Sequence, residues 1–182
     1  MSVREPDTNA THLTPHASLG YRARQFFAAL RAEVGADERA LVARTLTTEE
    51  RRLFDQMPIY DQRHCLDVYR TLVDAGHSDL LLLRAAIFHD CGKVDDDGMP
   101  MSLGWYILVT LLKRIPLLYH TAAASGRGPL RPVRIYAEHA WRGAQMAAAA
   151  GSPPEIVAIL RHYHDPAPTG LAAILQWADE QH

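Results

Sequence analysis

At 182 residues, the chain has the length of one domain that can bury a substantial apolar core without disulfides or a structural metal. Its formal net charge of -2 at pH 7 argues against broad electrostatic binding to nucleic acid or to anionic membranes, so we expect no specific nucleic-acid partner and no stable membrane insertion. Two cysteines are too few for a disulfide scaffold, which predicts reduced thiols and a cytoplasmic protein.

Positions 1–18 are polar and lack the apolar stretch of a signal peptide, so they predict a flexible tail. The rest of the chain, 19–182, is expected to be one helical domain, because its apolar residues recur with helical spacing and no run alternates as a strand does. Positions 19–58 form a helical lead-in, and 59–182 contain the candidate site. The predicted fold class is an all-α, single-domain bundle.

Three helices are predicted in the lead-in. An apolar stripe indicates the first over 21–34, and Asp37 is expected to cap the second. Thr47, with Glu50 three residues later, has the spacing of a capping box, in which each side chain accepts a hydrogen bond from the other residue's backbone N–H. This pattern begins the third helix, which is expected to end before Pro58.

The next two helices carry the first chemically informative residues. A helix over 59–75 contains His64, and the apolar helix after it ends at His89 and Asp90. Both of these last side chains therefore lie at a helix terminus. Positions 91–101 contain glycine, proline and three successive aspartates, and they are predicted as an exposed loop.

The most apolar stretch of the chain, 103–119, is too short and too interrupted by Lys113, Arg114 and Pro116 to be a transmembrane span. It is predicted as a buried helix kinked near Pro116. A homodimer interface, a lid over the site and a shallow membrane contact are the alternatives, in this order. Positions 120–132 are small and flexible in composition and are predicted as a loop.

Three further helices complete the chain. The first runs over 131–150. The second follows Ser152, which is expected to be its N-cap, and ends near His162 or His164. The last covers 170–180. No internal repeat or domain linker interrupts this succession.

Four residues, His89, Asp90, Gly92 and Lys93, are the most informative feature of the sequence. Adjacent imidazole and carboxylate groups at a helix end can both reach one divalent cation, and a lysine just beyond them can reach a phosphate held by that cation. A His-Asp pair alone is weak, but other helices supply further ligand types. The other predicted members of this metal site are His64, His139, His162, His164 and Asp179.

This order of residues resembles the HD-domain superfamily, an all-helical group of metal-dependent phosphohydrolases named for a His-Asp pair. The resemblance extends from His64 to Asp179 and rests on HDCGK from His89, EHAWRGAQM around His139, and LQWAD ending at Asp179. Family members usually have isoleucine or valine where this chain has Cys91. A free cysteine behaves as a small hydrophobe at such an interior position, so the substitution is compatible with the resemblance.

The resemblance implies one or two divalent metal ions as cofactor. Imidazole and carboxylate ligands without thiolates suit Mn, Fe, Co, Ni or Mg better than a closed structural zinc site. Ligands on separate helices also leave coordination positions for water and substrate. The implied ligands of the first metal are His64, His89, Asp90 and Asp179.

A second metal would add histidines that lie between the His-Asp pair and the last aspartate, with Asp90 bridging the two ions. His139 fits the first of these positions. Both His162 and His164 fall where the second is expected, and residues two apart on a helix cannot share a face. A slight preference goes to His162, because it lies further inside its helix, and His164 is the close alternative.

The implied reaction is hydrolysis of a phosphoester by a metal-activated water, with Asp90 and Lys93 as the catalytic residues. Lys93 would neutralise charge that develops on the phosphoryl oxygens. Arg63 and Arg142 are candidates for substrate binding through phosphate contacts, and Glu138 for a proton acceptor or an outer partner of a ligand. Ordinary solvated helix charges are the alternative interpretation of these three residues.

The expected substrate is a small-molecule phosphoester, a nucleotide or a related compound. A GYP-type extension after the late histidine is missing, since 165–170 read DPAPTG, which counts against a cyclic di-guanylate phosphodiesterase. Two alternatives stay open. Some relatives use the same ligand pattern to hold two irons and oxygenate a small polyol or phosphonate, and a non-catalytic nucleotide-binding regulatory module would keep the scaffold without turnover.

Overall fold

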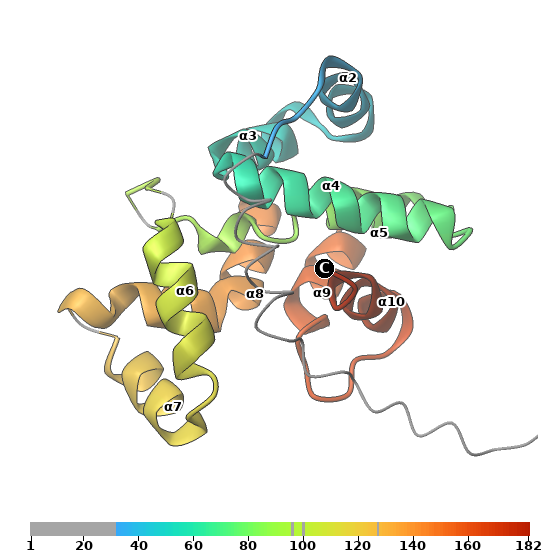
Figure 1. The fold of residues 1–182 in the computed structure, drawn as a ribbon. Helices are drawn as coiled ribbons and strands as arrows, with labels where there is room; N and C mark the ends of the chain where they lie inside the picture. The colour runs from blue at the N-terminus through green and yellow to red at the C-terminus, as the bar shows by residue number, and fades with distance from the viewer. Residues whose placement is uncertain (1–31, 96, 100, 127) are drawn as a thin grey trace, which may run out of the picture. The chain divides into compact units, whose positions relative to one another are not determined.

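The computed structural model describes residues 32–95, 97–99, 101–126 and 128–182. In this part of the chain the regular elements are helices and no β-strand occurs (Figure 1), which confirms the predicted all-α fold class. The tail expected over 1–18 and most of the helix expected over 21–34 lie outside the described residues. None of the described helices combines the length and the apolar character that crossing a membrane requires.

The lead-in contains α2 (Ala36–Thr45) and α3 (Thr48–Gln56). The predicted capping box of α3 is present, because Thr47 Oγ1 accepts a hydrogen bond from the Glu50 N–H at 3.3 Å and the Glu50 carboxylate accepts one from the Thr47 N–H at 3.0 Å. α3 ends before Pro58, as predicted. Asp37 was expected to cap α2, but Gly35 is its N-cap residue and Asp37 lies in the first turn.

Helices α4 (Ile59–Asp74) and α5 (Leu80–Phe88) pack against each other, and the 3-10 turn η1 (Cys91–Lys93) follows α5. The Asp79 side chain caps α5 by accepting hydrogen bonds from two backbone N–H groups of its first turn. Helix α5 is apolar on nearly all sides, and its residues from Ala85 to Phe88 are fully buried. Such a helix must be surrounded, and α3, α4, α9 and α10 all contact it.

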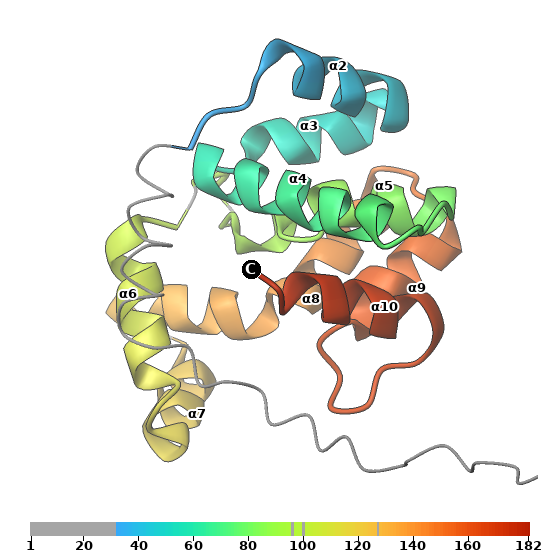
Figure 2. The same cartoon turned by 45° about the vertical axis from the view of Figure 1, so that its right-hand side comes forward.

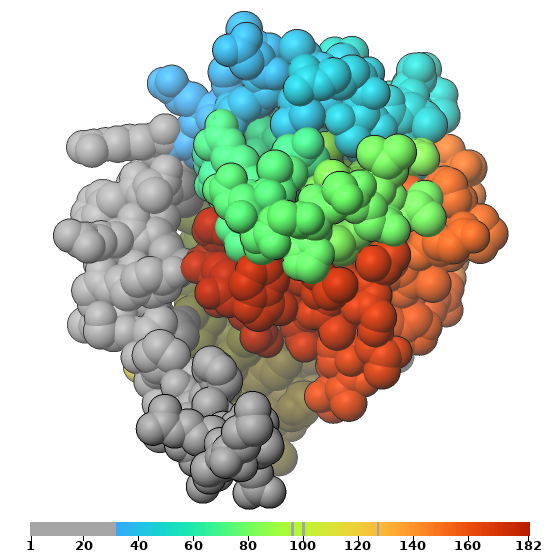
Figure 3. All heavy atoms as spheres, turned by 90° about the vertical axis from the view of Figure 1, so that its right-hand side faces the viewer, coloured from blue at the N-terminus to red at the C-terminus, as the bar shows by residue number. Residues whose placement is uncertain are grey.

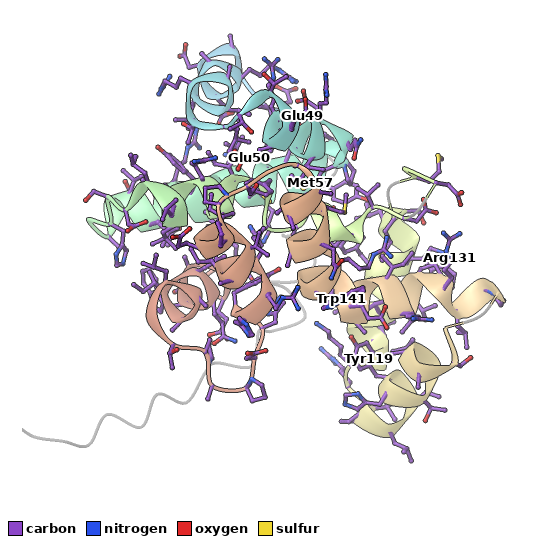
Figure 4. All side chains as sticks on the ribbon, turned by 180° about the vertical axis from the view of Figure 1, so that it is seen from behind. Glu49, Glu50, Met57, Tyr119, Arg131 and Trp141 are labelled. Atoms are coloured by element: carbon purple, nitrogen blue, oxygen red, sulfur yellow. The ribbon has the colours of Figure 1, made fainter. Side chains whose placement is uncertain are left out.

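Three helices close the chain, namely α8 (Arg131–Ala149), α9 (Pro154–His162) and α10 (Gly170–Asp179). Their positions agree with the prediction. The expected N-cap was wrong, however, because Pro153 occupies the N-cap position of α9 and Ser152 bonds elsewhere. The Ser152 hydroxyl donates to Glu50 Oε1 at 2.7 Å, which ties the beginning of α9 to α3 (Figure 4).

The main core is built from α2 to α5, the later part of α8, α9 and α10. Figure 3 shows the side chains of α4 and α5 lying between those of α2 and α3 on one side and those of α10 on the other. The largest fully buried side chains belong to this core; among them are Phe54, Leu66, Leu82, Phe88 and Tyr163.

The apolar segment is two helices, α6 (Leu103–Leu112) and α7 (Pro116–Ser125), where one kinked helix was predicted. The break has a simple cause: Pro116 lacks a backbone N–H and its ring blocks continuation of α6, whereas the first turn of a new helix accepts proline. The loop predicted over 120–132 was also wrong, since α7 continues to Ser125. Gly126, with a positive φ of 52°, ends it.

Helices α6 and α7 pack on the beginning of α8, whereas α9 packs along its later part (Figure 2). A second, small core of Val109, Ala122 and Val133 joins the three helices. The prediction that this segment is buried was wrong for most of its large side chains. Leu111 is 54% exposed and Leu117 is 81% exposed, because no described helix covers that side of the pair.

Candidate metal centre

The predicted first ligands meet where α4 and the end of α5 lie side by side. His64 extends from α4, His89 is the C-cap residue of α5, and Asp90 is the first residue of the following turn. One ligand atom from each lies within 4.8 Å of the other two, a spacing that allows all three to hold one ion. His64 Nε2 and His89 Nε2 are each 3.7 Å from an oxygen of Asp90.

Asp179, the last residue of α10, joins this group from the far end of the sequence. Its Oδ1 lies 2.8 Å from His64 Nε2 and 3.4 Å from His89 Nε2. The carboxylate therefore faces the same two imidazoles as Asp90. All four residues that the resemblance assigned to a first metal are neighbours in the structure.

Two further histidines extend the cluster on the side of α8. His139 Nε2 lies 3.7 Å from Asp90 Oδ1, and His164 Nε2 lies 3.1 Å from His139 Nε2. His164 Nε2 is also 4.0 Å from Asp179 Oδ2. Asp90 therefore lies between two groups of imidazoles, a placement that suits a carboxylate shared by two ions.

The structure corrects the preference for His162 as the later histidine. α9 ends at His162, whose ring pairs with Asp165 at 2.8 Å on the surface, where its side chain is 53% exposed. The fully buried Tyr163 follows as the C-cap residue and anchors the chain as it leaves the helix. The next residue, His164, is thereby brought to His139. The choice of His162 because it lies further inside its helix was therefore wrong. The burial of Tyr163 determines which of the two neighbouring histidines faces the cluster.

Backbone hydrogen bonds orient two of the imidazoles toward the cluster. His89 Nδ1–H donates to the Ala86 carbonyl at 2.9 Å, and His139 Nδ1–H donates to the Tyr136 carbonyl at 2.6 Å. This tautomer leaves each Nε2 as a lone pair, as metal-binding histidines require.

The two lone pairs differ in their surroundings. The Tyr163 hydroxyl donates to His139 Nε2 at 2.9 Å. His89 Nε2, in contrast, is fully buried and has no hydrogen-bond partner in the described part of the chain. A buried acceptor without a donor is costly, and a metal ion at this position would satisfy it.

The electrostatics of the cluster keep Asp90 ionised and His139 neutral, the protonation states in which both groups can bind a metal. Burial would raise the pKa of Asp90, but Lys93 and the surrounding histidines hold it well below its usual value. Burial, reinforced by the positive charge of Lys93, lowers the pKa of His139 to about 3, so this imidazole is neutral at pH 7. Burial alone would lower the pKa of His89, yet nearby acidic groups, Asp90 among them, raise it well above the usual value. A cation would compete with that proton.

Lys93 points into the centre, as predicted. It is buried, its Nζ donates to Asp90 Oδ2, and it lies 5.4 and 5.5 Å from the ring centroids of Tyr106 and Tyr136. Neighbouring carboxylates outweigh the effect of burial and raise the lysine pKa, so the side chain stays charged.

Asp61 is a candidate site residue that the sequence analysis missed. It is 4% exposed and accepts a hydrogen bond from the Tyr106 hydroxyl at 2.6 Å. Burial raises its pKa to about 6. Its position three residues before His64 on one helix face was an available signal. For Tyr106 the sequence offered no such signal, because this residue lies in the apolar segment that was predicted to be a buried helix.

Gly92 has a packing role that explains its place after the His-Asp pair. A Cβ atom at this position would lie 2.0 Å from the His139 carbonyl oxygen and 2.5 Å from the Gly143 nitrogen. Only glycine therefore lets η1 approach α8 this closely. Arg142 secures the same contact by donating to the carbonyls of Gly92 and Val94, so its guanidinium binds backbone here rather than facing the cluster.

Two other predicted residues are not brought to the centre. Arg63 forms ion pairs with Glu38 at 2.6 Å and with Asp67 at 2.9 Å. Glu138 pairs with Arg134 at 2.9 Å and is 40% exposed. Glu138 follows the alternative interpretation of a solvated helix charge, whereas Arg63 belongs to a partly buried ion-pair group with Glu38 and Asp67.

Comparisons of the chain with protein-family models, with curated proteins and with solved structures found no match. The chemistry of this centre therefore rests on its own geometry. Three helix ends, two helix interiors and a turn bring imidazoles, carboxylates and one lysine into one cluster.

Proposed function

We propose that the chain is an HD-type, metal-dependent phosphohydrolase that acts on a phosphoester of a nucleotide or related small molecule. The observation that carries this proposal is the unpartnered, fully buried Nε2 of His89. It faces two carboxylates, Asp90 and Asp179, that arrive from separate parts of the fold. A cation bound between these carboxylates and the ring nitrogen would replace the proton that the acidic groups otherwise hold on His89.

The donor set fits a catalytic divalent cation. Nitrogen and oxygen donors without thiolate suit Mn, Fe, Co, Ni or Mg. When bound, such a cation supplies a water acidic enough to lose its proton near neutral pH and withdraws charge from a phosphoryl oxygen. The residues that would hold the first ion are His64, His89, Asp90 and Asp179, and those that would hold a second are Asp90, His139 and His164.

The remaining groups would act on the phosphoester itself. Lys93 keeps its positive charge next to Asp90 and is positioned to balance charge that develops on the phosphoryl oxygens. Asp61, with a pKa of about 6, can take up or release a proton near neutral pH. Glu138, which is paired on the surface, is not placed for that role.

The first test is elemental analysis of the full chain purified without chelators or an affinity metal. We expect one or two ions per chain, lost in Asp90→Ala and retained in the matched control His162→Ala, whose imidazole lies outside the cluster. Phosphate release from a panel of nucleotides should require the ion and should fall in Lys93→Ala while the metal content stays unchanged. No ion after incubation with excess Mn²⁺, or an ion unaffected by Asp90→Ala, would sink the proposal.

The same measurements separate the alternatives. Two irons per chain, with oxygen consumption and no phosphate release, would favour the oxygenase chemistry. A tightly bound nucleotide without turnover under any metal would favour a regulatory module.

A further inference from the structure

The surface of α6 and α7 has an unusual concentration of exposed apolar side chains. Half of the twelve large hydrophobic residues that are exposed in the described structure fall between positions 107 and 118. Their exposure reaches 81% at Leu117. Soluble surfaces carry such residues singly, and a contiguous group marks an interaction site. This apolar patch consists of Ile107, Leu108, Leu111, Ile115, Leu117 and Leu118.

The charged residues between positions 98 and 137, the stretch that contains the patch, are all basic. From position 98 to position 137 the sequence contains no Asp or Glu, although it carries five Lys and Arg residues. Lys113 and Arg114 lie in the middle of the patch, between Leu111 and Ile115. Arg114 is exposed and has no ion-pair partner among the described residues. The overall net charge of -2 therefore conceals a segment whose charged residues are all basic. Of these residues, Arg131 and Arg134 pair with Asp97 and Glu138 outside the segment.

The fold presents this segment outward. The small core of Val109, Ala122 and Val133 attaches α6 and α7 to α8, and Tyr119 packs on the same core (Figure 4). Each helix has ten residues, which is too short to cross a bilayer. A surface that combines exposed apolar side chains with cations can bind a membrane interface, because the apolar side chains enter the acyl boundary and the cations attract anionic headgroups.

We propose that the apolar patch, with Lys113 and Arg114, docks on the surface of a membrane that contains anionic phospholipids. The acyl boundary would take up the leucine and isoleucine side chains, and the anionic headgroups would supply the negative charge that the segment lacks. A second copy of the chain fits less well. A two-fold interface would bring the patch onto itself and place two sets of Lys113 and Arg114 together without a carboxylate of the segment to pair with them.

The test is co-sedimentation of the full-length protein with phosphatidylglycerol-containing vesicles and with pure phosphatidylcholine vesicles. We expect binding to the phosphatidylglycerol-containing vesicles alone. This binding should weaken in 0.5 M NaCl, because salt screens the attraction between the cations and the anionic headgroups. Neutralising Lys113 and Arg114 together (Lys113→Gln/Arg114→Gln) should lower the partition coefficient by about 25-fold, since each cation near such a surface contributes roughly fivefold. Leu117→Gln/Leu118→Gln should also remove most of the binding.

Matched controls come from outside the segment. Arg44→Gln/Arg161→Gln removes two exposed cations, and Val73→Gln/Leu80→Gln removes two exposed apolar side chains. Both controls should bind as the unmodified chain does, with unchanged far-UV circular dichroism in all four variants.

Three outcomes would overturn the proposal. The first is equal binding to both vesicle types, or an equal loss in the control variants. The second is no vesicle binding together with a dimer that Leu117→Gln/Leu118→Gln dissociates, which would assign the patch to a second copy. The third is vesicle binding that both Lys113→Gln/Arg114→Gln and Leu117→Gln/Leu118→Gln leave unchanged, which would place the membrane contact outside the patch.

Discussion

Helices α5 and α6 are comparably apolar in sequence and opposite in environment. Helix α5 is contacted by α3, α4, α9 and α10, and most of its side chains are buried. Helix α6 is contacted by α7 and α8, and only Val109 among its residues is buried. The apolar content of a helix determines how much of its surface is unfavourable to expose to water. The number of helices packed around it determines whether the chain itself buries that surface.

The two regions also differ in what their polar groups do. Around α5 the buried polar residues belong to connected sets, one at the candidate metal centre and one around Glu50. On α6 and α7 the charged residues remain at the surface with the apolar patch. The first region is organised for a ligand inside the fold, and the second for a surface outside it.

The largest difference should appear when one leucine is shortened in each region. Leu82→Ala in α5 removes a fully buried side chain and should lower the free energy of unfolding by about 2–5 kcal/mol. Leu111→Ala in α6, where the side chain is 54% exposed, should change it by no more than about 0.5 kcal/mol. Urea unfolding followed by circular dichroism measures both. Equal losses would mean that the patch is covered in solution.

Glycine substitutions sharpen the same contrast. Gly92→Ala should destabilise the chain by about 1–3 kcal/mol, because its Cβ would meet backbone atoms of α8, and it should weaken metal binding by displacing η1. In α6 the nearest atom to a Cβ at Gly104 is 4.0 Å away. Gly104→Ala should therefore stabilise by about 0.5–1 kcal/mol through helix propensity. Thermal unfolding with and without Mn²⁺ reports both effects, and a harmless Gly92→Ala would contradict the close approach.

A pH effect is expected from Glu50, which is fully buried and bonded to Arg84 and Ser152. Burial raises its pKa, but hydrogen bonds from the Thr47 N–H, Arg84 and Ser152 outweigh burial and lower it below 4.5. Its carboxylate therefore stabilises the fold above pH 4.5, and this contribution is lost as the pH falls through the lowered value.

Glu50→Gln should accordingly lower the free energy of unfolding by about 1–3 kcal/mol at pH 7. As the pH falls through the lowered pKa of Glu50, this variant should lose less stability than the unmodified chain does. The neighbouring Glu49, with a side chain 52% exposed and paired to Arg52, supplies the control Glu49→Gln (Figure 4). Urea unfolding at pH 7 and over the acid range checks the pair. Parallel pH profiles for the Glu50 variant and the unmodified chain would refute the assignment.

The smallest effect is expected at Arg63. Its side chain is 20% exposed and pairs with Glu38 and Asp67 rather than with a member of the cluster, so Arg63→Ala should leave metal content and phosphate release unchanged. A selective loss of turnover would return Arg63 to the candidate substrate-binding residues.

Much of the local structure was predictable because its signals act over three or four residues. The capping box of Thr47 and Glu50 and the end of α3 before Pro58 required no tertiary contact. The same holds for the position of the His-Asp pair at the end of α5. The candidate site was also largely predictable as a set, since His64, His89, Asp90, His139 and Asp179 lie together in the structure.

By itself the sequence determined the helices, their caps and the residue types available for a metal centre, because those properties depend on neighbours along the chain. The tertiary structure decided which of His162 and His164 faces the cluster, since that depends on the burial of Tyr163 between them. It also placed Asp61 with Tyr106 and left the apolar patch of α6 and α7 uncovered. Each of these outcomes depends on which helices pack together, and the spacing of residues along the chain does not predict that packing.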